Sequence, residues 1–209
     1  MLIIGLTGSI GMGKTTAARR IASHGIPVFD ADAEVHRLYE AEAAPLIGAA
    51  FPGTVSGGRV DRGLLAKAVL DDAEKLAKLE AIVHPLVRKS QREFLKQQRD
   101  GGADMVVLEI PLLFETGADR LVDVTIVVTA PGDLQRQRVL QRPGMSEQKL
   151  ASILAQQIPD AEKRGRADFI VETEGPVEAT GEIIDRIIES LRGRKGSAID
   201  RWLEGEDAG

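Results

Sequence analysis

Short apolar runs alternate with longer amphipathic segments along this chain. The runs lack a strict alternation of apolar and polar positions, which is typical of strands buried on both faces of a parallel sheet. Helical patterns between them indicate βαβ crossovers, so we predict an α/β fold with a mostly parallel five-stranded sheet as the middle of three layers. The predicted strands are residues 2–6, 26–29, 105–110, 124–129 and 169–171.

The interval between the second and third predicted strands is too long for a single crossover. Residues 33–100 have the pattern of several helices, interrupted by a loop at Pro52–Gly53 and Ser56–Gly58. We expect a helical insertion over the carboxyl edge of the sheet, where a second substrate usually binds. The alternative is a helical scaffold without a binding role.

A second unusual segment is residues 135–166, which is polar, arginine-rich and helical, with a break at Pro143–Gly144. It is either a solvated helix pair or a mobile helical lid whose arginines close over phosphates, and we favour the lid. Residues 178–191 form a terminal amphipathic helix. From Gly193 the chain is glycine-rich and charged, which predicts a mobile tail, although Trp202 could anchor a short helix there.

These segments predict the domain organisation. The core is expected in three pieces, the insertion and the lid lie between them, and the tail follows. The predicted ranges are 1–32, 101–134 and 167–192 for the nucleotide-binding core, 33–100 for the insertion, 135–166 for the lid and 193–209 for the tail.

The stretch from Gly8 to Thr15 fits G-x-x-x-x-G-K-S/T, the phosphate-binding P-loop, between a predicted strand and a predicted helix. Glycines allow backbone N–H groups to turn inward, where they form an anion cradle with the helix N-terminus. Lys14 supplies positive charge to the β- and γ-phosphates, and the Thr15 hydroxyl is placed for Mg²⁺. The alternative is a glycine-rich turn that binds nothing.

Composition narrows the protein class. The 209 residues, 43% of them hydrophobic, suit one domain or one core with an inserted subdomain. A net charge of −5 leaves no global basic footprint for nucleic acid. The chain has no cysteine and no asparagine, which excludes disulfides and N-glycosylation. With neither a membrane-spanning stretch nor a signal peptide in view, we expect a soluble cytoplasmic protein that binds no membrane. No oligomeric state is predicted.

Several motifs together resemble dephospho-coenzyme A kinase, over residues 1 to about 191. The P-loop alone indicates only a nucleotide, and the other motifs make the resemblance specific. In chain order they are LTGSIGMGKTT at 6–16, Asp30–Asp32, His84–Leu86, Pro111–Glu115, Arg138 with Arg142, Met145–Ser146, Gln157 and Ala167–Val171. The chain departs from the family pattern at three positions, each of which usually holds another residue: Pro143 in place of Asp or Asn, Thr173 in place of Asn, and Glu109 in place of Asp.

The resemblance implies transfer of the ATP γ-phosphoryl group to the ribose 3′-hydroxyl of dephospho-coenzyme A, giving coenzyme A and ADP with Mg²⁺. Phosphoryl transfer depends mainly on positioning and charge neutralisation. Lys14 would be catalytic, and Thr15 would hold Mg²⁺, with Glu109 acting through a water. The implied nucleotide-binding residues are Gly8, Gly11, Met12, Gly13, Lys14, Thr15, Thr16 and Arg142.

The resemblance also implies the acceptor site. Asp32 would be the general base and contact the substrate, with Asp30 behind it, although both carboxylates could instead cap a helix. His84 and Glu115 are implied substrate contacts, and His84 could equally be structural.

Arg138 and Arg142 are four residues apart, which places them on one face of a helix. Arg138 is the implied catalytic arginine, and the alternative is a pair of surface salt bridges.

Three other functions compete with this interpretation. A different small-molecule or nucleoside kinase would share the core and differ in the acceptor pocket. A GTP-dependent switch would need an N-K-x-D motif, which a chain without asparagine cannot contain. A nonenzymatic ATP sensor is the third, because fold alone does not determine function.

Overall fold

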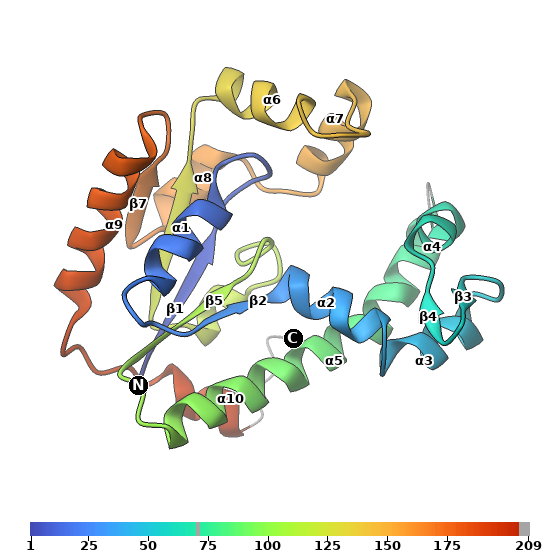
Figure 1. Ribbon diagram of the computed structural model, residues 1–209, viewed down its shortest axis with the longest axis horizontal. Coiled ribbons are helices and arrows are strands. Elements are labelled where there is room, and N and C mark those ends of the chain that lie inside the picture. Colours follow the sequence, from blue (N-terminus) through green and yellow to red (C-terminus); the bar gives the residue numbers. More distant parts are fainter. Residues whose placement is uncertain (70–71, 205–209) are drawn as a thin grey trace. The chain divides into compact units, whose positions relative to one another are not determined.

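The computed structural model describes residues 1–69 and 72–204 (Figure 1). The chain divides into two compact units, one made of Met1–Phe29 with the chain from Leu95 onward, the other of Asp30–Phe94. Each unit has its own cluster of buried apolar side chains. In the described residues no helix is both long enough and apolar enough to cross a membrane.

The first unit contains the predicted five-stranded sheet. Strand β1 pairs with β5 and β6, and β6 pairs with β7, all in parallel, so the predicted α/β class is confirmed. From one edge to the other the strands are β2 (Val28–Asp30), β5 (Met105–Glu109), β1 (Leu2–Thr7), β6 (Val124–Thr129) and β7 (Phe169–Glu172). In this register Leu6 of β1 aligns with Glu109 of β5, which brings Glu109 to the edge where the P-loop begins.

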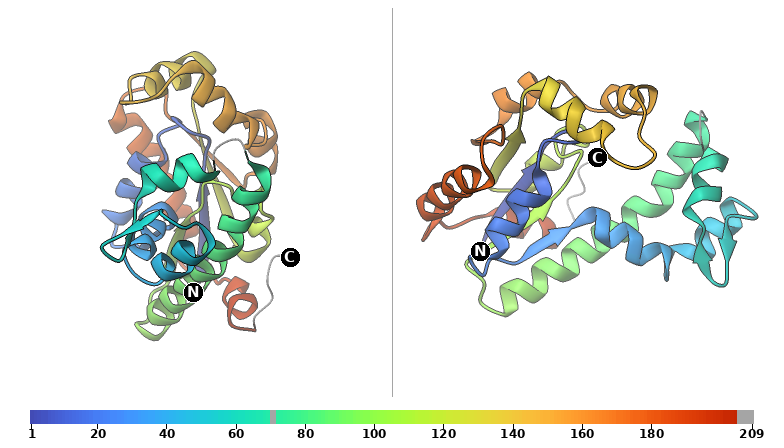
Figure 2. Two further views of the ribbon diagram at one scale, coloured as in Figure 1. Left: turned by 90° about the vertical axis from the view of Figure 1, so that its right-hand side faces the viewer. Right: turned by 45° about the horizontal axis from the view of Figure 1, so that its top comes forward.

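Helices cover both faces of this sheet. On one face, α1 (Lys14–Ala22) and α9 (Val177–Leu191) contact each other and share a core with alternate residues of β1 (Figures 1 and 2). On the other face lie the 3₁₀ helix η1 (Ala118–Leu121), α8 (Asp160–Arg166) and α10 (Ala198–Glu204). The three-layer prediction is therefore confirmed. Burial of both faces explains why the strands are apolar throughout.

Two further helices belong to this unit, α6 (Gly132–Leu140) and α7 (Glu147–Ala155). They follow β6 and precede α8, and the predicted Pro143–Gly144 break falls between them. The Ser146 hydroxyl accepts the Lys149 amide at 3.3 Å and so caps α7.

The last described segment differs from the predicted mobile tail. The Asp123 carboxylate accepts the backbone N–H groups of Ser197 and Ala198 at 2.7 and 2.8 Å, and that of Ile3 at 2.9 Å. The buried Trp202 indole donates to the Leu121 carbonyl at 2.7 Å. Residues 198–204 thus form a short helix anchored by Trp202, which was the alternative to a mobile tail. Residues 205–209 lie outside the described part.

The second unit, Asp30–Phe94, is mostly helical, and its bounds differ from those of the predicted insertion, 33–100. Its core joins Leu38, Ile47, Phe51, Leu65 and Leu79. Its elements are α2 (Ala31–Tyr39), α3 (Ala43–Ala50), β3 (Val55–Ser56), β4 (Arg59–Val60), α4 (Arg62–Val69) and the first part of α5 (Ala73–Asp100).

The predicted loop in this unit is a small antiparallel hairpin. Val55 of β3 pairs with Val60 of β4. Gly57 and Gly58 connect the two strands with φ angles of 57° and 77°. Positive φ at both loop residues is typical of a type I′ hairpin turn, and glycine adopts it without steric cost.

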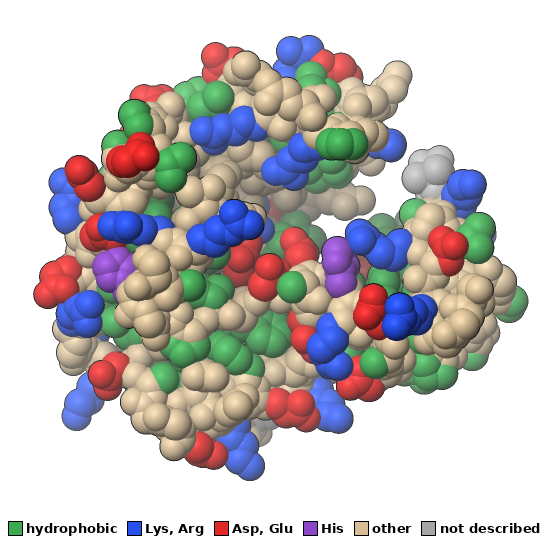
Figure 3. Space-filling view, viewed as in Figure 1, with side chains coloured by type: hydrophobic (Ala, Val, Ile, Leu, Met, Phe, Trp, Pro, Cys, Tyr) green, Lys and Arg blue, Asp and Glu red, His purple; other side chains and the backbone are tan. Residues whose placement is uncertain are grey.

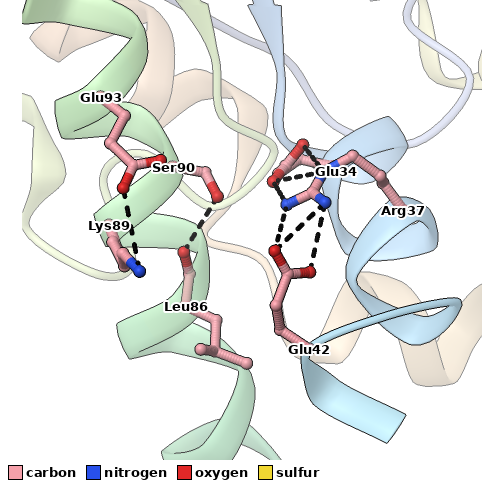
Figure 4. Close-up of polar contacts among 7 residues, drawn as sticks. All are labelled: Glu34, Arg37, Glu42, Leu86, Lys89, Ser90 and Glu93. Carbon is pink, nitrogen blue, oxygen red and sulfur yellow. Dashed lines mark hydrogen bonds and ion pairs between the residues drawn. The ribbon is translucent and has the colours of Figure 1, made fainter.

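An arginine fork fixes the start of this unit (Figure 4). Arg37 of α2 donates to Glu34 at 2.8 Å and to Glu42, just before α3, at 3.2 Å. Hydrogen bonding from Arg37 lowers the pKa of the Glu34 carboxyl. Arg37 is about half exposed, so this network orients α2 and α3 more than it stabilises them.

Basic and acidic side chains are interspersed on the face shown in Figure 3.

Candidate nucleotide site and acceptor pocket

The P-loop has the predicted strand–loop–helix setting, between β1 and α1. Gly11 and Gly13 have φ angles of 79° and 92°, a conformation that favours glycine. A Cβ atom at Gly8 would lie 2.5 Å from the Val128 carbonyl oxygen, and one at Gly11 would lie 2.6 Å from Val139. The glycines are therefore required both for the turn and for close packing of the loop against its surroundings.

The N-terminus of α1, beside this loop, has no acidic side chain in its first turn that would repel an anion. Gly13 offers no side chain to cap it. Thr15 and Thr16 are exposed in this turn. Backbone N–H groups at a helix start and the positive end of the helix dipole together favour an anion here.

Lys14 is mostly buried and forms an ion pair. Its Nζ lies 3.1 Å from Glu109 Oε1, and the two side chains are only 15% and 8% exposed. The parallel register of β1 and β5 explains this contact, because it places the end of β5 beside the P-loop. Glu109, which the sequence associates with Mg²⁺, is thus a partner of the P-loop lysine.

Two glutamines hold the P-loop backbone at Ile10. Gln135 of α6 donates to the Ile10 carbonyl at 2.7 Å, and the Ile10 N–H donates to Gln157 at 3.3 Å. Gln135 is buried. Sequence reasoning missed Gln135 and noted Gln157 only as part of the resemblance. A buried polar side chain on a polar helix gives no periodic signal that would reveal it.

Arg138 lies against the P-loop and not in a surface salt bridge. Its guanidinium donates to Thr173 Oγ1 at 2.9 Å and to the Thr173 carbonyl at 2.6 Å. Thr173 in turn contacts the Met12 carbonyl at 2.9 Å. The prediction that Arg138 and Arg142 lie on one helix face is wrong. Helix α6 ends at Leu140, and Arg142 is exposed beyond its end.

Asp30 ends β2, Asp32 follows it by two residues, and the two carboxylates have different surroundings. Asp30 is the N-cap of α2, and its carboxylate accepts the Ala33 N–H at 2.9 Å. Asp32 lies inside the first turn of α2, so the capping interpretation applies to Asp30. Asp32 instead lines a pocket within the helical unit.

That pocket has a volume of about 760 Å³ and combines polar groups with an apolar wall. Asp32, His36, Tyr39 and Arg62 supply the polar groups. Burial raises the pKa of the Tyr39 phenol. The apolar wall consists of Val35, Leu65, Ala66, Val69 and Leu79.

The remaining predicted substrate contacts have other surroundings. His84 is exposed on α5 and is not among the residues that line this pocket. Glu115 lies 2.8 Å from Nζ of the fully buried Lys163 and accepts the Ile158 N–H at 3.0 Å. A buried lysine needs a paired charge, so Glu115 stabilises the α7–α8 connection. Sequence reasoning missed Lys163, which resembles its exposed neighbours in an arginine-rich helix.

Magnesium fits the residues at the P-loop. Mg²⁺ prefers oxygen ligands and is usually held by one or two protein groups together with substrate phosphates and water. The exposed Thr15 hydroxyl at the start of α1 offers one such ligand next to the anion cradle.

Comparisons with known proteins agree with one another. The family model for dephospho-CoA kinase matches residues 2–178. A dephospho-CoA kinase of Mesorhizobium japonicum is 57% identical over 94% of this chain and 100% of the relative. The crystal structure of TT1252 from Thermus thermophilus is similar with a TM-score of 0.79 and 38% identity, covering 92% of this chain and 98% of that one. A dephospho-CoA kinase from Campylobacter jejuni is similar with a TM-score of 0.64 and 25% identity, covering 90% and 96%. The chain belongs to the dephospho-CoA kinase family.

Proposed function

We propose that this protein transfers the γ-phosphoryl group of ATP to the ribose 3′-hydroxyl of dephospho-coenzyme A, which is the last step of coenzyme A synthesis. The observation that carries the proposal is the P-loop with Lys14 at its end and Arg138 held against it, in a chain of this family. Such a kinase would act in the cytoplasm.

The nucleotide side needs charge neutralisation more than covalent chemistry. Backbone N–H groups of Gly8, Gly11, Met12 and Gly13 would supply the anion cradle for the phosphates. Lys14 contacts the β- and γ-phosphates. It either gives up its ion pair with Glu109 to do so or keeps both contacts. Thr15 would hold Mg²⁺, which neutralises charge on the transferred group when bound, and Thr16 and Arg142 complete the nucleotide contacts.

The acceptor side is assigned to the pocket of the helical unit. Asp32 receives the proton of the attacking hydroxyl, for which a positioned carboxylate contributes about 10²–10⁴ in rate. Arg62 pairs with the diphosphate of dephospho-coenzyme A, and the apolar wall takes the uncharged arm of the same molecule. His84 and Glu115 remain predicted substrate contacts outside this pocket.

The function is tested by ADP release with different acceptors. The enzyme is incubated with ATP and Mg²⁺, and dephospho-coenzyme A, adenosine and water are compared as acceptors. We expect ADP formation that depends on dephospho-coenzyme A. A higher rate with a nucleoside would support the alternative kinase, and nucleotide binding without ADP from any acceptor would support a sensor.

Removing the P-loop lysine should separate charge from fold. We expect Lys14→Ala to reduce turnover by about 10²–10³, comparable to the loss of one preorganised electrostatic donor. The variant should also unfold more easily, by about 1–3 kcal/mol, because the mostly buried Glu109 carboxylate loses its cation. Turnover and thermal unfolding are measured on one preparation.

The double variant Lys14→Ala with Glu109→Gln is the matched control. It also removes the negative charge that Lys14 pairs with, and it should regain stability without regaining turnover. A folded Lys14→Ala protein with near-normal turnover would rule out this lysine as part of the site.

Amide exchange should show which part of the predicted lid moves. Gln135 and Val139 pack α6 against the P-loop, so α6 should exchange as slowly as α9. The segment from Arg142 through α7 should exchange faster in the free protein and slow when ATP and acceptor bind, because arginine–phosphate contacts form on closure. The same protection of α7 in both states would identify it as fixed scaffold.

A further inference from the structure

One buried hydroxyl, that of Thr173, links Arg138 to the P-loop. Arg138 Nη1 donates to Thr173 Oγ1 at 2.9 Å, and Oγ1 lies 2.9 Å from the Met12 carbonyl oxygen. The side chain of Thr173 is almost completely buried. A guanidinium and a P-loop carbonyl thus meet on a single side chain.

The sheet fixes the backbone of Thr173. The residue follows β7, and its N–H donates to the Thr129 carbonyl at 2.9 Å, which continues the β6–β7 pairing by one residue. Its own carbonyl accepts a second bond from Arg138, at 2.6 Å. Arg138 is therefore held at two points of a residue that cannot shift without disturbing the sheet.

The hydroxyl uses both of its hydrogen-bonding capacities. It can accept from Arg138 and donate its one proton. Two carbonyl oxygens lie within reach, Met12 at 2.9 Å and Thr129 at 3.3 Å. The shorter distance favours Met12, while Thr129 already accepts the backbone N–H of Thr173.

Holding the Met12 carbonyl also orients the next amide. A trans peptide is planar, so the Gly13 N–H points away from the side to which the Met12 carbonyl points. Gly13 itself lies close, because a Cβ there would be 3.2 Å from Thr173 Oγ1. Thr173 thus directs one N–H of the P-loop away from itself.

Arg138 keeps donors for a ligand. A guanidinium has five N–H donors, and two of them point at Thr173. A planar guanidinium that is already fixed loses less freedom when it binds an anion than a free side chain does. Preorganised charge of this kind is what stabilises a transferring phosphoryl group.

We propose that Thr173 is a positioning residue for phosphoryl transfer, whose hydroxyl fixes the Arg138 guanidinium against the P-loop. The proposal rests on the proposed function and on Arg138 as the group that contacts the transferred phosphate. The family pattern has Asn at this position, so this chain makes the link with a hydroxyl.

The test compares Thr173→Val, which keeps the shape, with Thr173→Ser, which keeps the hydroxyl. We expect the kcat of Thr173→Val to fall about 10- to 100-fold, as expected when a buried hydrogen-bonding link is lost. The KM for ATP should change less than about threefold, since Lys14 and the loop still bind the nucleotide. Thr173→Ser should restore kcat to within about threefold of the original.

Thr180→Val is the matched control. Thr180 is also a buried threonine whose hydroxyl donates to a backbone carbonyl, that of Glu172 at 3.3 Å. Thr180 lies on α9 and has no hydrogen bond to Arg138 among the described residues. The kcat of Thr180→Val should therefore stay within about twofold of that of the original protein. If Thr173→Val does not fold, Thr173→Ser and Thr173→Ala form the same comparison, differing by the hydroxyl alone.

A double-mutant cycle with Arg138→Ala completes the test. If Thr173 acts through Arg138, adding Thr173→Val to Arg138→Ala should lower kcat less than about threefold further. Normal kcat in Thr173→Val, or full multiplication of the two losses, would overturn the proposal. Failure of the proposed function is a separate result, because it would appear as no dephospho-coenzyme A-dependent ADP release by the unmodified protein.

Discussion

Replacing Arg138 by alanine should reduce turnover by about 10³–10⁵, the range associated with a catalytic arginine in phosphoryl transfer. The structure supports this over the surface salt-bridge interpretation, since the guanidinium is held by Thr173 beside the Met12 carbonyl. ATP affinity should change little, because Lys14 and the loop amides remain. Turnover, ATP affinity and melting temperature should be measured together.

Arg136→Ala is the control for this experiment. Arg136 lies two residues away on α6, is exposed, and pairs with Glu147. Surface pairs of this kind contribute little to stability, so Arg136→Ala should stay folded. Its turnover should match that of the original protein, because Arg136 lies outside the proposed site. Arg138→Lys keeps the charge but loses the fork geometry and should recover only part of the activity. A stable Arg138→Ala protein with more than a tenth of normal turnover would exclude Arg138 from the transfer step.

Asp32→Asn is the second variant with a large expected effect. Turnover should fall by about 10²–10⁴, because Asn keeps the shape but cannot take up a proton at neutral pH. Melting temperature and ATP affinity should stay near normal. The cap of α2 is unaffected, since Asp30 and not Asp32 accepts the Ala33 N–H.

Asp30 provides the matched control, because the structure separates the two carboxylates. Asp30→Asn should keep both cap and activity, since Asn caps about as well as Asp. Asp30→Ala should cost about 0.5–2 kcal/mol of stability. A stable Asp32→Asn protein with normal turnover would eliminate Asp32 as the base and direct attention to the other polar groups of the pocket, His36 and Tyr39.

The features predicted well from the sequence are those with a local signal. Each central strand is a continuous apolar run because both of its faces are covered, and the P-loop glycines are forced by backbone angles at Gly11 and Gly13. The fold class follows from the apolar runs. The family follows from the resemblance that the full set of motifs carries, because the P-loop alone indicates only a nucleotide site. The small hairpin was missed because β3 and β4 have two residues each, too few for any periodicity.

The features that the sequence did not reveal depend on contacts between distant residues. Lys14 meets Glu109 only through the register of two strands, and Thr173 meets Arg138 across 35 positions. Thr173 was visible in the sequence only as a departure from the family pattern. The segment after Gly193 was expected to be mobile from its composition. Its described part, up to residue 204, is held by Asp123 and Trp202 through bonds to backbone groups, which composition does not report.

The central claim is the identity of the product, and mass spectrometry with phosphorus NMR of the reaction mixture tests it most directly. The enzyme is incubated with ATP, Mg²⁺ and dephospho-coenzyme A, and the product is compared with authentic coenzyme A. We predict one added phosphate, on the ribose 3′-hydroxyl, formed in equal amount with ADP. Unchanged dephospho-coenzyme A beside released ADP, or a phosphate on any other hydroxyl, would contradict the account.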